Sequence, residues 1–415
     1  MPLDLSGQPF PVRSPTVTPG PAPISVSRAA SPVARAVAIP RRLALLGHAP
    51  ALDGLRGLAV VLVMIFHFVG HRWLKGGYVG VDLFFGLSGF LITVLILNEQ
   101  RVHGRLSLPL FYARRACRLL PALALLLGVW TLLLLAFHDQ HWMGATPSGD
   151  GSGRTVEVAG SLRDLGVALV YLANWNVISG GMEAPLAHLW SLAVEEQFYL
   201  IWPSVLLGLL LLGRRARLTI VAGLLLASAL LPALYHHGGM GKDRIYFGTD
   251  TRAVGLLAGA FAGLVWHERH CLGRLPRSAG LRALAGVALL LGVAWHPGGD
   301  FGKFVVLPAA LALAVSQVVP RLADNRGRLA RVFSVRWLVW AGKRSYGLYL
   351  WQYVWATWTH PLGLFVGVPL GILGTLASTQ LSWVLVESPA LRYGGRFRRP
   401  TAPEVVPVSR LRAAA

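Results

Sequence analysis

Acidic side chains are scarce in this sequence of 415 residues. The chain holds 18 Asp and Glu against 39 Lys and Arg, and charged residues together make up only 14% of it. Apolar residues account for 54%, and they recur as long runs rather than with the amphipathic periods of soluble helices. A composition of this kind excludes an ordinary soluble domain and indicates a protein embedded in a lipid bilayer.

Cysteine and metal-binding motifs are also nearly absent. Cys117 and Cys271 are the two cysteines, and both fall in basic connecting segments, which predicts free cytoplasmic thiols. No HExxH motif occurs, and the adjacent His236 and His237 lack the partners and spacing of a metal site. We therefore expect no bound metal.

The formal net charge of +21 does not indicate a nucleic-acid partner. Lys and Arg gather in clusters between the apolar runs, as they do in the cytoplasmic loops of membrane proteins. No groove-binding motif and no basic stripe with interleaved aromatic residues accompanies them. We expect the bilayer as a partner and no nucleic acid.

The apolar runs predict an all-α, polytopic fold with ten membrane-spanning helices. A further run at 162–175 has only about 14 residues, and counting it as a crossing would move every later basic loop to the wrong side. We therefore interpret it as a re-entrant or interfacial helix, with both termini cytoplasmic. The ten predicted spans lie at about residues 55–70, 78–97, 119–137, 189–212, 218–235, 253–267, 281–296, 303–319, 338–359 and 363–386.

The chain is predicted to have three parts. Residues 1–42 are rich in Pro, Ser, Ala and Arg and contain no apolar run, so we expect a disordered basic cytoplasmic tail rather than a cleavable signal. Residues 43–393 form the membrane domain, and 394–415 form a short basic cytoplasmic tail. This organisation predicts a multi-pass membrane protein, and we expect it in a bacterial plasma membrane.

Ionisable residues within the first two apolar runs point to a functional site, because such groups are costly in hydrocarbon. Arg56 and His67 are eleven residues apart, so they share a helical face to within about 20° and lie roughly 16 Å apart along the axis. Asp82 lies at a depth close to that of His67, which allows the two side chains to meet. In the alternative interpretation, Arg56 reaches the interface and His67 only bonds a neighbouring helix.

Two later motifs add charged groups. Arg115 and Arg118 are three residues apart, so they face the same way on a helix, and a pair of guanidinium groups suits phosphate, although such arginines also serve as topology signals. Glu195 and Glu196 lie roughly 10 Å deep in a span that enters from outside. At least one of these carboxylates must face a polar interior, and a salt bridge to a neighbouring helix is the alternative for the other.

In order along the chain, these stretches resemble the acyltransferase-3 family of integral membrane O-acyltransferases, whose signature includes an Arg and a His separated by ten residues. Gln352 stands where the family commonly has His, so we assign it no acid–base role. Ser88 lies in a small-residue packing segment, and we propose no serine nucleophile. The resemblance is carried by LDGLRGLAVVLVMIFH from Leu52, GGYVGVDLFFGLSGFLIT from Gly76, FYARRACRLLPAL from Phe111, HLWSLAVEEQFYLIWP from His188, GTDTRAVGLLAG from Gly248, SYGLYLWQYV from Ser345 and VESPALRY from Val386.

The resemblance covers about residues 50–393 and implies acyl transfer from acyl-CoA, such as acetyl-CoA or another short acyl-CoA, to a hydroxyl. We expect the donor's phosphates to bind at the cytoplasmic mouth, at Arg56, Arg115 and Arg118. We expect four catalytic residues to gather in the outer half of the membrane: His67, Asp82, Glu195 and Glu196. His67 is the expected general base, and one of the carboxylates would orient its ring. Direct transfer and an acyl-histidine intermediate both remain open.

The resemblance leaves the acceptor open between a cell-envelope glycan, a glycolipid and a secondary metabolite such as a macrolide. The competing function is a transporter or exporter of a glycan or metabolite, because intramembrane charges are also what a carrier needs. A non-catalytic subunit of an envelope complex is a third interpretation. The absence of an internal repeat argues against the carrier, and acyl transfer by the purified protein without a gradient would distinguish the classes.

Overall fold

The computed structural model describes residues 49–69, 76–136, 158–181, 186–272 and 302–397, all within one compact unit that covers 43–415. Helices and short connections account for these residues, and no strand occurs among them, which confirms the all-α prediction. The predicted span at 281–296, the tail 1–42 and most of the tail 394–415 lie outside the described residues.

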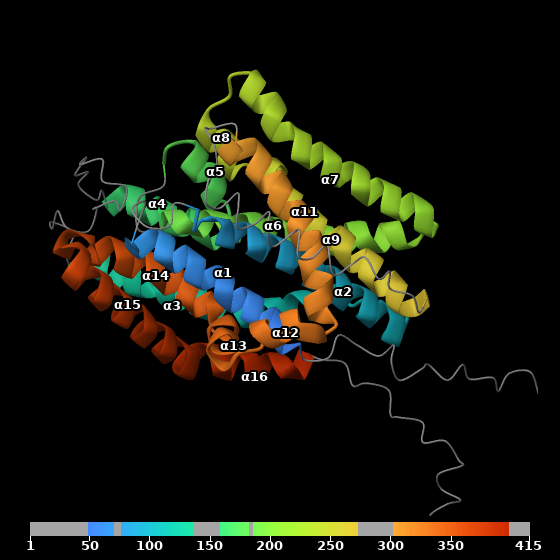
Figure 1. Ribbon diagram of the computed structural model, residues 1–415. Coiled ribbons are helices and arrows are strands. Elements are labelled where there is room, and N and C mark those ends of the chain that lie inside the picture. The colour runs from blue at the N-terminus through green and yellow to red at the C-terminus, as the bar shows by residue number, and fades with distance from the viewer. Residues whose placement is uncertain (1–48, 70–75, 137–157, 182–185, 273–301, 398–415) are drawn as a thin grey trace, which may run out of the picture. The chain divides into compact units, whose positions relative to one another are not determined.

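The helices follow one another through the chain as shown in Figure 1. Their bounds are α1 (Pro50–Val69), α2 (Val79–His103), α3 (Leu108–Ala136), α4 (Val158–Leu169), α5 (Ala173–Ile178), η5 (Ala187–Leu189), α6 (Trp190–Leu210), α7 (Arg214–His237), α8 (Lys242–Phe247), α9 (Thr249–Leu272), η6 (Gly302–Val306), α11 (Leu307–Ala323), α12 (Gly327–Phe333), α13 (Arg336–Lys343), α14 (Ser345–Thr359), η7 (His360–Leu362), α15 (Gly363–Ser382), η8 (Trp383–Glu387), α16 (Ser388–Gly394) and η9 (Gly395–Phe397).

Among the described residues, six helices are long and apolar enough to cross a membrane. They make the protein a multi-pass membrane protein, while the count of ten crossings and the cytoplasmic placement of both termini stay predictions. The six segments are Pro50–Val69, Val79–His103, Leu108–Ala136, Arg214–His237, Phe304–Ala323 and a part of Ser345–Phe397.

Two predicted segments are each divided into two helices in the structure. The predicted span 338–359 is not one helix, because α13 ends at Lys343 and α14 begins at Ser345. In α13, Gly342 packs closely against the backbone of α1 at Asp53. The predicted single helix at 162–175 is also broken, since Tyr171 takes a left-handed conformation (φ 56°) between α4 and α5. With 12 residues, α4 is roughly 18 Å long and too short to cross a membrane by itself.

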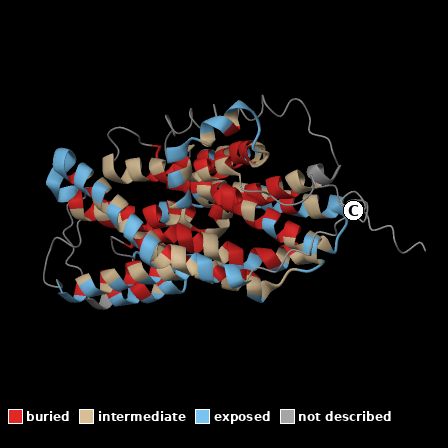
Figure 2. Ribbon diagram, turned by 90° about the horizontal axis from the view of Figure 1, so that it is seen from below, coloured by how far each residue is buried: buried red, intermediate tan, exposed pale blue. Residues whose placement is uncertain are grey.

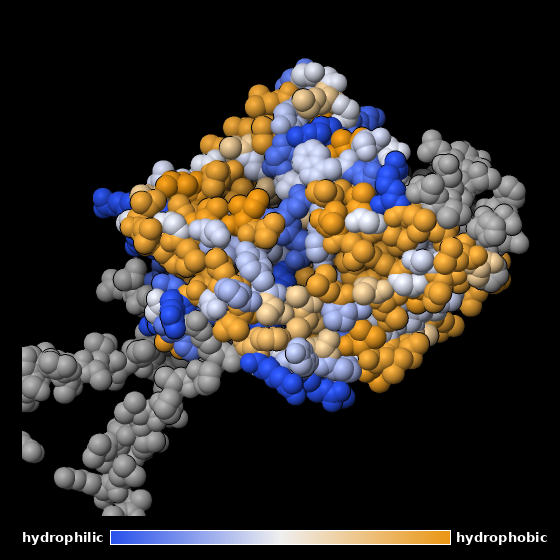
Figure 3. Space-filling view, turned by 180° about the vertical axis from the view of Figure 1, so that it is seen from behind, coloured by the Kyte–Doolittle hydropathy of each residue, from blue (hydrophilic) through white to orange (hydrophobic). Residues whose placement is uncertain are grey.

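Helix α2 lies at the centre of the packing. It contacts α1, α6, α9 and α11, and most of its residues are buried. Figure 2 shows buried residues concentrated along the middle of the bundle and exposed residues on its outer helices. The surface in Figure 3 is largely apolar and is crossed by a hydrophilic strip. Large exposed apolar side chains on α7 and α15, such as Leu230 and Phe365, are suited to contact with lipid.

Close packing of α2 on α9 depends on glycine. A Cβ atom added at Gly89 would collide with the backbone carbonyl of Leu256, and one added at Gly259 would collide with the carbonyl of Gly86. Small residues at such crossings let two helix backbones approach, which is the main source of packing energy between helices in lipid. Gly89 and Gly259 therefore allow α9 to pack closely against the central helix α2.

We predict that Gly89→Ala destabilises the protein by about 1–3 kcal/mol, because the added methyl group must displace the backbone of α9. Gly128→Ala in α3 is the matched control, since nothing lies within 4 Å of a Cβ at that position. Thermal midpoints of the two detergent-purified variants check this. Equal midpoints would show that the α2–α9 contact tolerates a side chain.

Candidate active site

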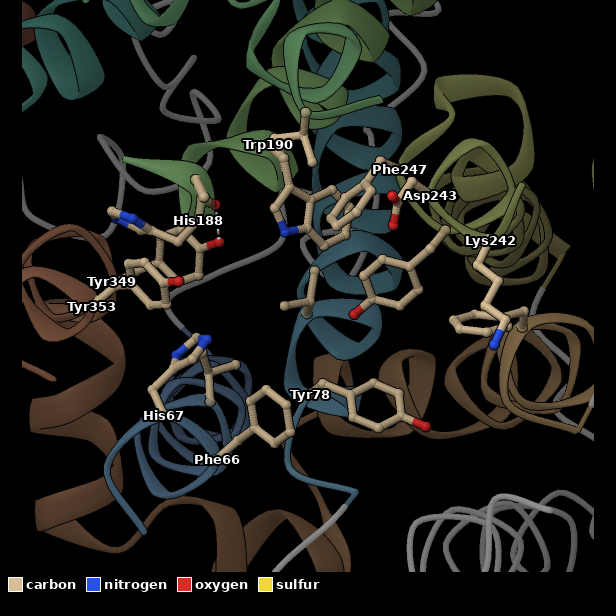
Figure 4. A pocket seen from close by; sticks show the side chains of 16 residues that line it. Phe66, His67, Tyr78, His188, Trp190, Lys242, Asp243, Phe247, Tyr349 and Tyr353 are labelled. Atoms are coloured by element: carbon tan, nitrogen blue, oxygen red, sulfur yellow. Dashed lines mark hydrogen bonds between the residues drawn. The ribbon is translucent and has the colours of Figure 1, made fainter. Parts of the chain in front are cut away.

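A cavity of about 330 Å³ surrounds the His67 side chain near the C-terminal end of α1. Figure 4 shows His67 facing Tyr349 and Tyr353 of α14, with Trp190 of α6 across the cavity. The exposed residues Lys242 and Asp243 of α8 border its other side. The wall is mostly aromatic and includes Phe66, Tyr78, Trp190, Tyr246, Phe247, Phe304, Tyr349 and Tyr353.

Gln352 of α14 is the hydrogen-bond partner of His67. The side-chain oxygen of this fully buried glutamine lies 2.8 Å from Nδ1 of the imidazole. With the amide in this assigned orientation, Nδ1 carries the proton and Nε2 is left unprotonated. The Tyr353 ring packs edge-on against the imidazole, with 4.8 Å between the ring centroids. Together these contacts fix both the tautomer and the orientation of the ring.

Asp82 does not meet His67, which corrects the contact that the sequence allowed. Its Oδ1 lies 3.0 Å from Nη1 of Arg252 on α9, and both side chains are buried. The guanidinium group also lies over the Tyr246 ring, 4.1 Å from its centroid. A buried carboxylate requires a compensating cation, and a neutral imidazole cannot supply one. Asp82 therefore stabilises the contact of α2 with α9 instead of orienting the histidine.

A second, smaller cavity of about 130 Å³ contains the three arginines that the sequence grouped together, Arg56, Arg115 and Arg118. Arg56 and His67 thus lie in different cavities at the two ends of α1. Val81 and Tyr349 line both cavities. The two spaces therefore adjoin at these residues.

The two glutamates of α6 lie with the arginines and not with His67, contrary to the expected grouping. Glu196 forms a bidentate pair with Arg115, at 2.9 Å to Nε and 2.5 Å to Nη2. Glu195 accepts hydrogen bonds from Ser88, at 2.5 Å, and Tyr199, at 2.8 Å, and lies 3.8 Å from Arg115. Adjacent carboxylates in an apolar interior require a cation, and Arg115 of α3 supplies it. The salt bridge considered from the sequence is therefore present.

Arg56 and Arg118 differ from Arg115 in their electrostatic environment. Neither makes a hydrogen bond or salt bridge within the described part of the chain, and the two guanidinium groups repel each other. Arg115 forms a bidentate pair with Glu196, whereas Arg56 and Arg118 line the same cavity without a salt bridge. Glu195 also lines this cavity and attracts Arg118, so three guanidinium groups face one carboxylate there. A cavity of this kind favours an anionic ligand.

Sequence reasoning missed several residues that build the site. Gln352 departs from the family pattern, yet that departure occurs at the position that contacts His67. Gln197, directly after the glutamates, donates to the carbonyl of Tyr171 and to Asn174 and accepts from Thr249. This half-buried network attaches α5 and the start of α9 to α6. No local pattern reveals it, because its members are far apart in the chain.

Comparison with known proteins gives one family. A model of an acyltransferase domain matches residues 50–387. The chain is 34% identical over 369 residues to a protein named peptidoglycan O-acetyltransferase OatA, from Listeria monocytogenes. It is also 34% identical over 372 residues to the putative peptidoglycan O-acetyltransferase YrhL of Bacillus subtilis, and 32% identical over 375 residues to a putative O-acetyltransferase of Staphylococcus aureus.

Each of these alignments covers 84% of this chain but only 56–58% of the relative. The chain therefore spans a little over half the length of the curated proteins that it matches. No solved structure significantly matches it.

We predict that Glu196→Ala lowers the free energy of unfolding by about 2–3 kcal/mol, because it leaves the charge of Arg115 without its bidentate partner. The double variant Arg115→Ala, Glu196→Ala should recover part of that loss, since it removes both charges. Denaturation of the two single variants and the double variant completes the cycle. Additive losses would show that the pair contributes no coupling energy.

Proposed function

The chain belongs to the acyltransferase-3 family, and on that basis we propose that it transfers an acetyl or other short acyl group from acyl-CoA to a hydroxyl of a cell-envelope glycan. The observation that supports this most directly is the pair of adjoining cavities along α1. One contains cationic groups suited to a phosphorylated donor, and the other contains an oriented imidazole. A two-substrate transfer needs both.

The donor is proposed to bind in the arginine cavity. Coenzyme A carries several phosphate oxygens, and guanidinium groups bind such oxygens with charge-assisted hydrogen bonds. Arg56 and Arg118 form no salt bridge among the described residues and repel each other, so a phosphate would relieve that repulsion. Arg115 is held by Glu196, and its role is to shape the cavity and to orient Tyr199, whose ring lies 3.2 Å from the guanidinium carbon.

The acceptor is proposed to bind in the His67 cavity. Its aromatic wall offers flat apolar surfaces with polar edges, which suit the faces and hydroxyl groups of a sugar ring. Lys242 and Asp243 border the cavity with exposed charged groups. Two of the relatives are named for peptidoglycan O-acetylation, so among the candidate acceptors a glycan is favoured over a glycolipid or a macrolide.

In the proposed reaction, Nε2 of His67 takes the proton of the acceptor hydroxyl as its oxygen attacks the thioester carbonyl. The new bond joins the acceptor oxygen to the acyl carbon, and the carbon–sulfur bond breaks. The proton on the imidazole then passes to the departing thiolate, which leaves as the free thiol of coenzyme A. Gln352 keeps Nδ1 protonated throughout, so the same nitrogen, Nε2, receives and returns the proton.

We predict that His67→Gln lowers turnover per folded molecule by about 10²- to 10⁴-fold with saturating acyl-CoA and acceptor, because glutamine keeps hydrogen bonding but cannot take the proton. His360→Gln, at an exposed histidine of η7, is the control and should keep normal turnover. The assay measures acyl transfer by purified protein in detergent, where no gradient exists. Near-normal turnover of His67→Gln would refute the base assignment, and absence of transfer by the unchanged protein would favour a carrier.

We predict that Arg118→Ala raises the KM for acyl-CoA by about 10- to 100-fold with little change in kcat, because a lost charge-assisted hydrogen bond costs about 1.5–3 kcal/mol and is made equally in the ground and transition states. Arg115→Ala should raise KM less and lower stability more, since Arg115 is already paired. Arg392→Ala, an exposed arginine of α16, is the control. An unchanged KM in Arg118→Ala would refute the phosphate-binding role and leave this arginine with a role in membrane topology only.

A further inference from the structure

Val81 of α2 and Tyr349 of α14 lie where the two cavities adjoin, and each lines both of them. We propose that these two side chains form a constriction that the acyl group must pass, and that this constriction selects the size of the acyl group. The inference rests on the proposed function, because it concerns the donor of that reaction. It adds a residue pair that determines specificity and takes no part in the chemistry.

The transfer geometry places the constriction on the path of the acyl group. The arginines hold the phosphates on one side, and His67 acts on the other. Arg56 and His67 are separated by roughly 16 Å along α1, which is of the order of the extended pantetheine arm that joins the phosphates to the thioester. The arm therefore crosses beside Val81 and Tyr349 with the acyl group leading.

Tyr349 is firmly held at this point. Its hydroxyl donates to the carbonyl oxygen of His188 at 2.6 Å, and it accepts from Oγ of Ser191 at 2.5 Å. Figure 4 shows the Tyr349 hydroxyl directed at the His188 segment. The side chain is 9% exposed, and its ring also contacts the ring of Phe84. Moving Tyr349 aside for a bulky acyl group would break both hydrogen bonds.

The size of the His67 cavity does not by itself explain selection for a short acyl group. At about 330 Å³ it is far larger than an acetyl group, so a longer chain would fit beyond the constriction. The arginine cavity on the other side holds about 130 Å³. We therefore expect the junction to exclude long acyl groups as they enter the His67 cavity. This preference for short acyl groups should disappear when the junction is widened.

The test compares acetyl-CoA with butyryl-CoA in the full-length protein, with a soluble N-acetylglucosamine tetramer as acceptor and release of free coenzyme A as the readout. Val81→Ala widens the junction by two methyl groups, and Tyr349→Phe keeps the ring but removes both hydrogen bonds. In each variant, kcat/KM for butyryl-CoA relative to acetyl-CoA should rise by about 10-fold, the lower end of the effect of one methylene group in a pocket. Val81→Leu should lower the same ratio.

Val60→Ala is the matched control, because Val60 is a buried valine of α1 that lines neither cavity. In this variant, the ratio of kcat/KM for butyryl-CoA to kcat/KM for acetyl-CoA should equal that of the unchanged protein, even if the stability of the variant falls. Normal acetyl transfer with an unchanged ratio in Val81→Ala, Val81→Leu and Tyr349→Phe would overturn the constriction and leave the proposed function intact. Failure of the unchanged protein to transfer from either donor would instead refute the proposed function.

Discussion

An ionised side chain inside a membrane protein costs free energy unless an opposite charge or a ligand compensates it, and this constraint organises the structure. Asp82 is paired with Arg252, and Glu196 is paired with Arg115. These pairs hold α2 to α9 and α3 to α6. Arg56 and Arg118 form no salt bridge within the described residues, and they line one cavity with Glu195. The paired charges support the fold, while the two arginines without a salt bridge line the cavity proposed to bind the donor phosphates.

The HLWSLAVEEQF stretch shows how closely spaced residues can serve different parts of one site. The carbonyl of His188 and the hydroxyl of Ser191 hold Tyr349 between the two cavities. Trp190 forms part of the wall of the His67 cavity. Glu196 holds Arg115, and Gln197 attaches α5 and the start of α9. The N-terminal part of α6 and the residues just before it therefore position both cavities relative to each other. This role accounts for the many polar residues in an otherwise apolar helix.

In the proposed reaction, the membrane location has a chemical consequence. Donor phosphates bind at one end of α1 and the acceptor hydroxyl at the other, so the acyl group moves along the helix while coenzyme A stays on its own side. An oriented, unprotonated imidazole between aromatic walls suits proton transfer to and from a hydroxyl. A carrier would have no evident use for an imidazole whose tautomer is fixed by Gln352, so this contact favours the proposed enzyme over a carrier.

Local patterns in the sequence determined the all-helical class, the apolar runs, and the shared helical face of Arg115 and Arg118, because helix periodicity and hydropathy are properties of short segments. Tertiary packing decided which groups meet. His67 pairs with Gln352 across 285 positions, Asp82 with Arg252 across 170, and Arg115 with Glu196 across 81. His67 and Asp82 lie at similar depths from their shared loop, which is compatible with contact. Depth alone, however, does not determine how each helix is rotated about its axis. That rotation is set by contacts such as those of Gly89 and Gly259 between α2 and α9, which no single segment specifies.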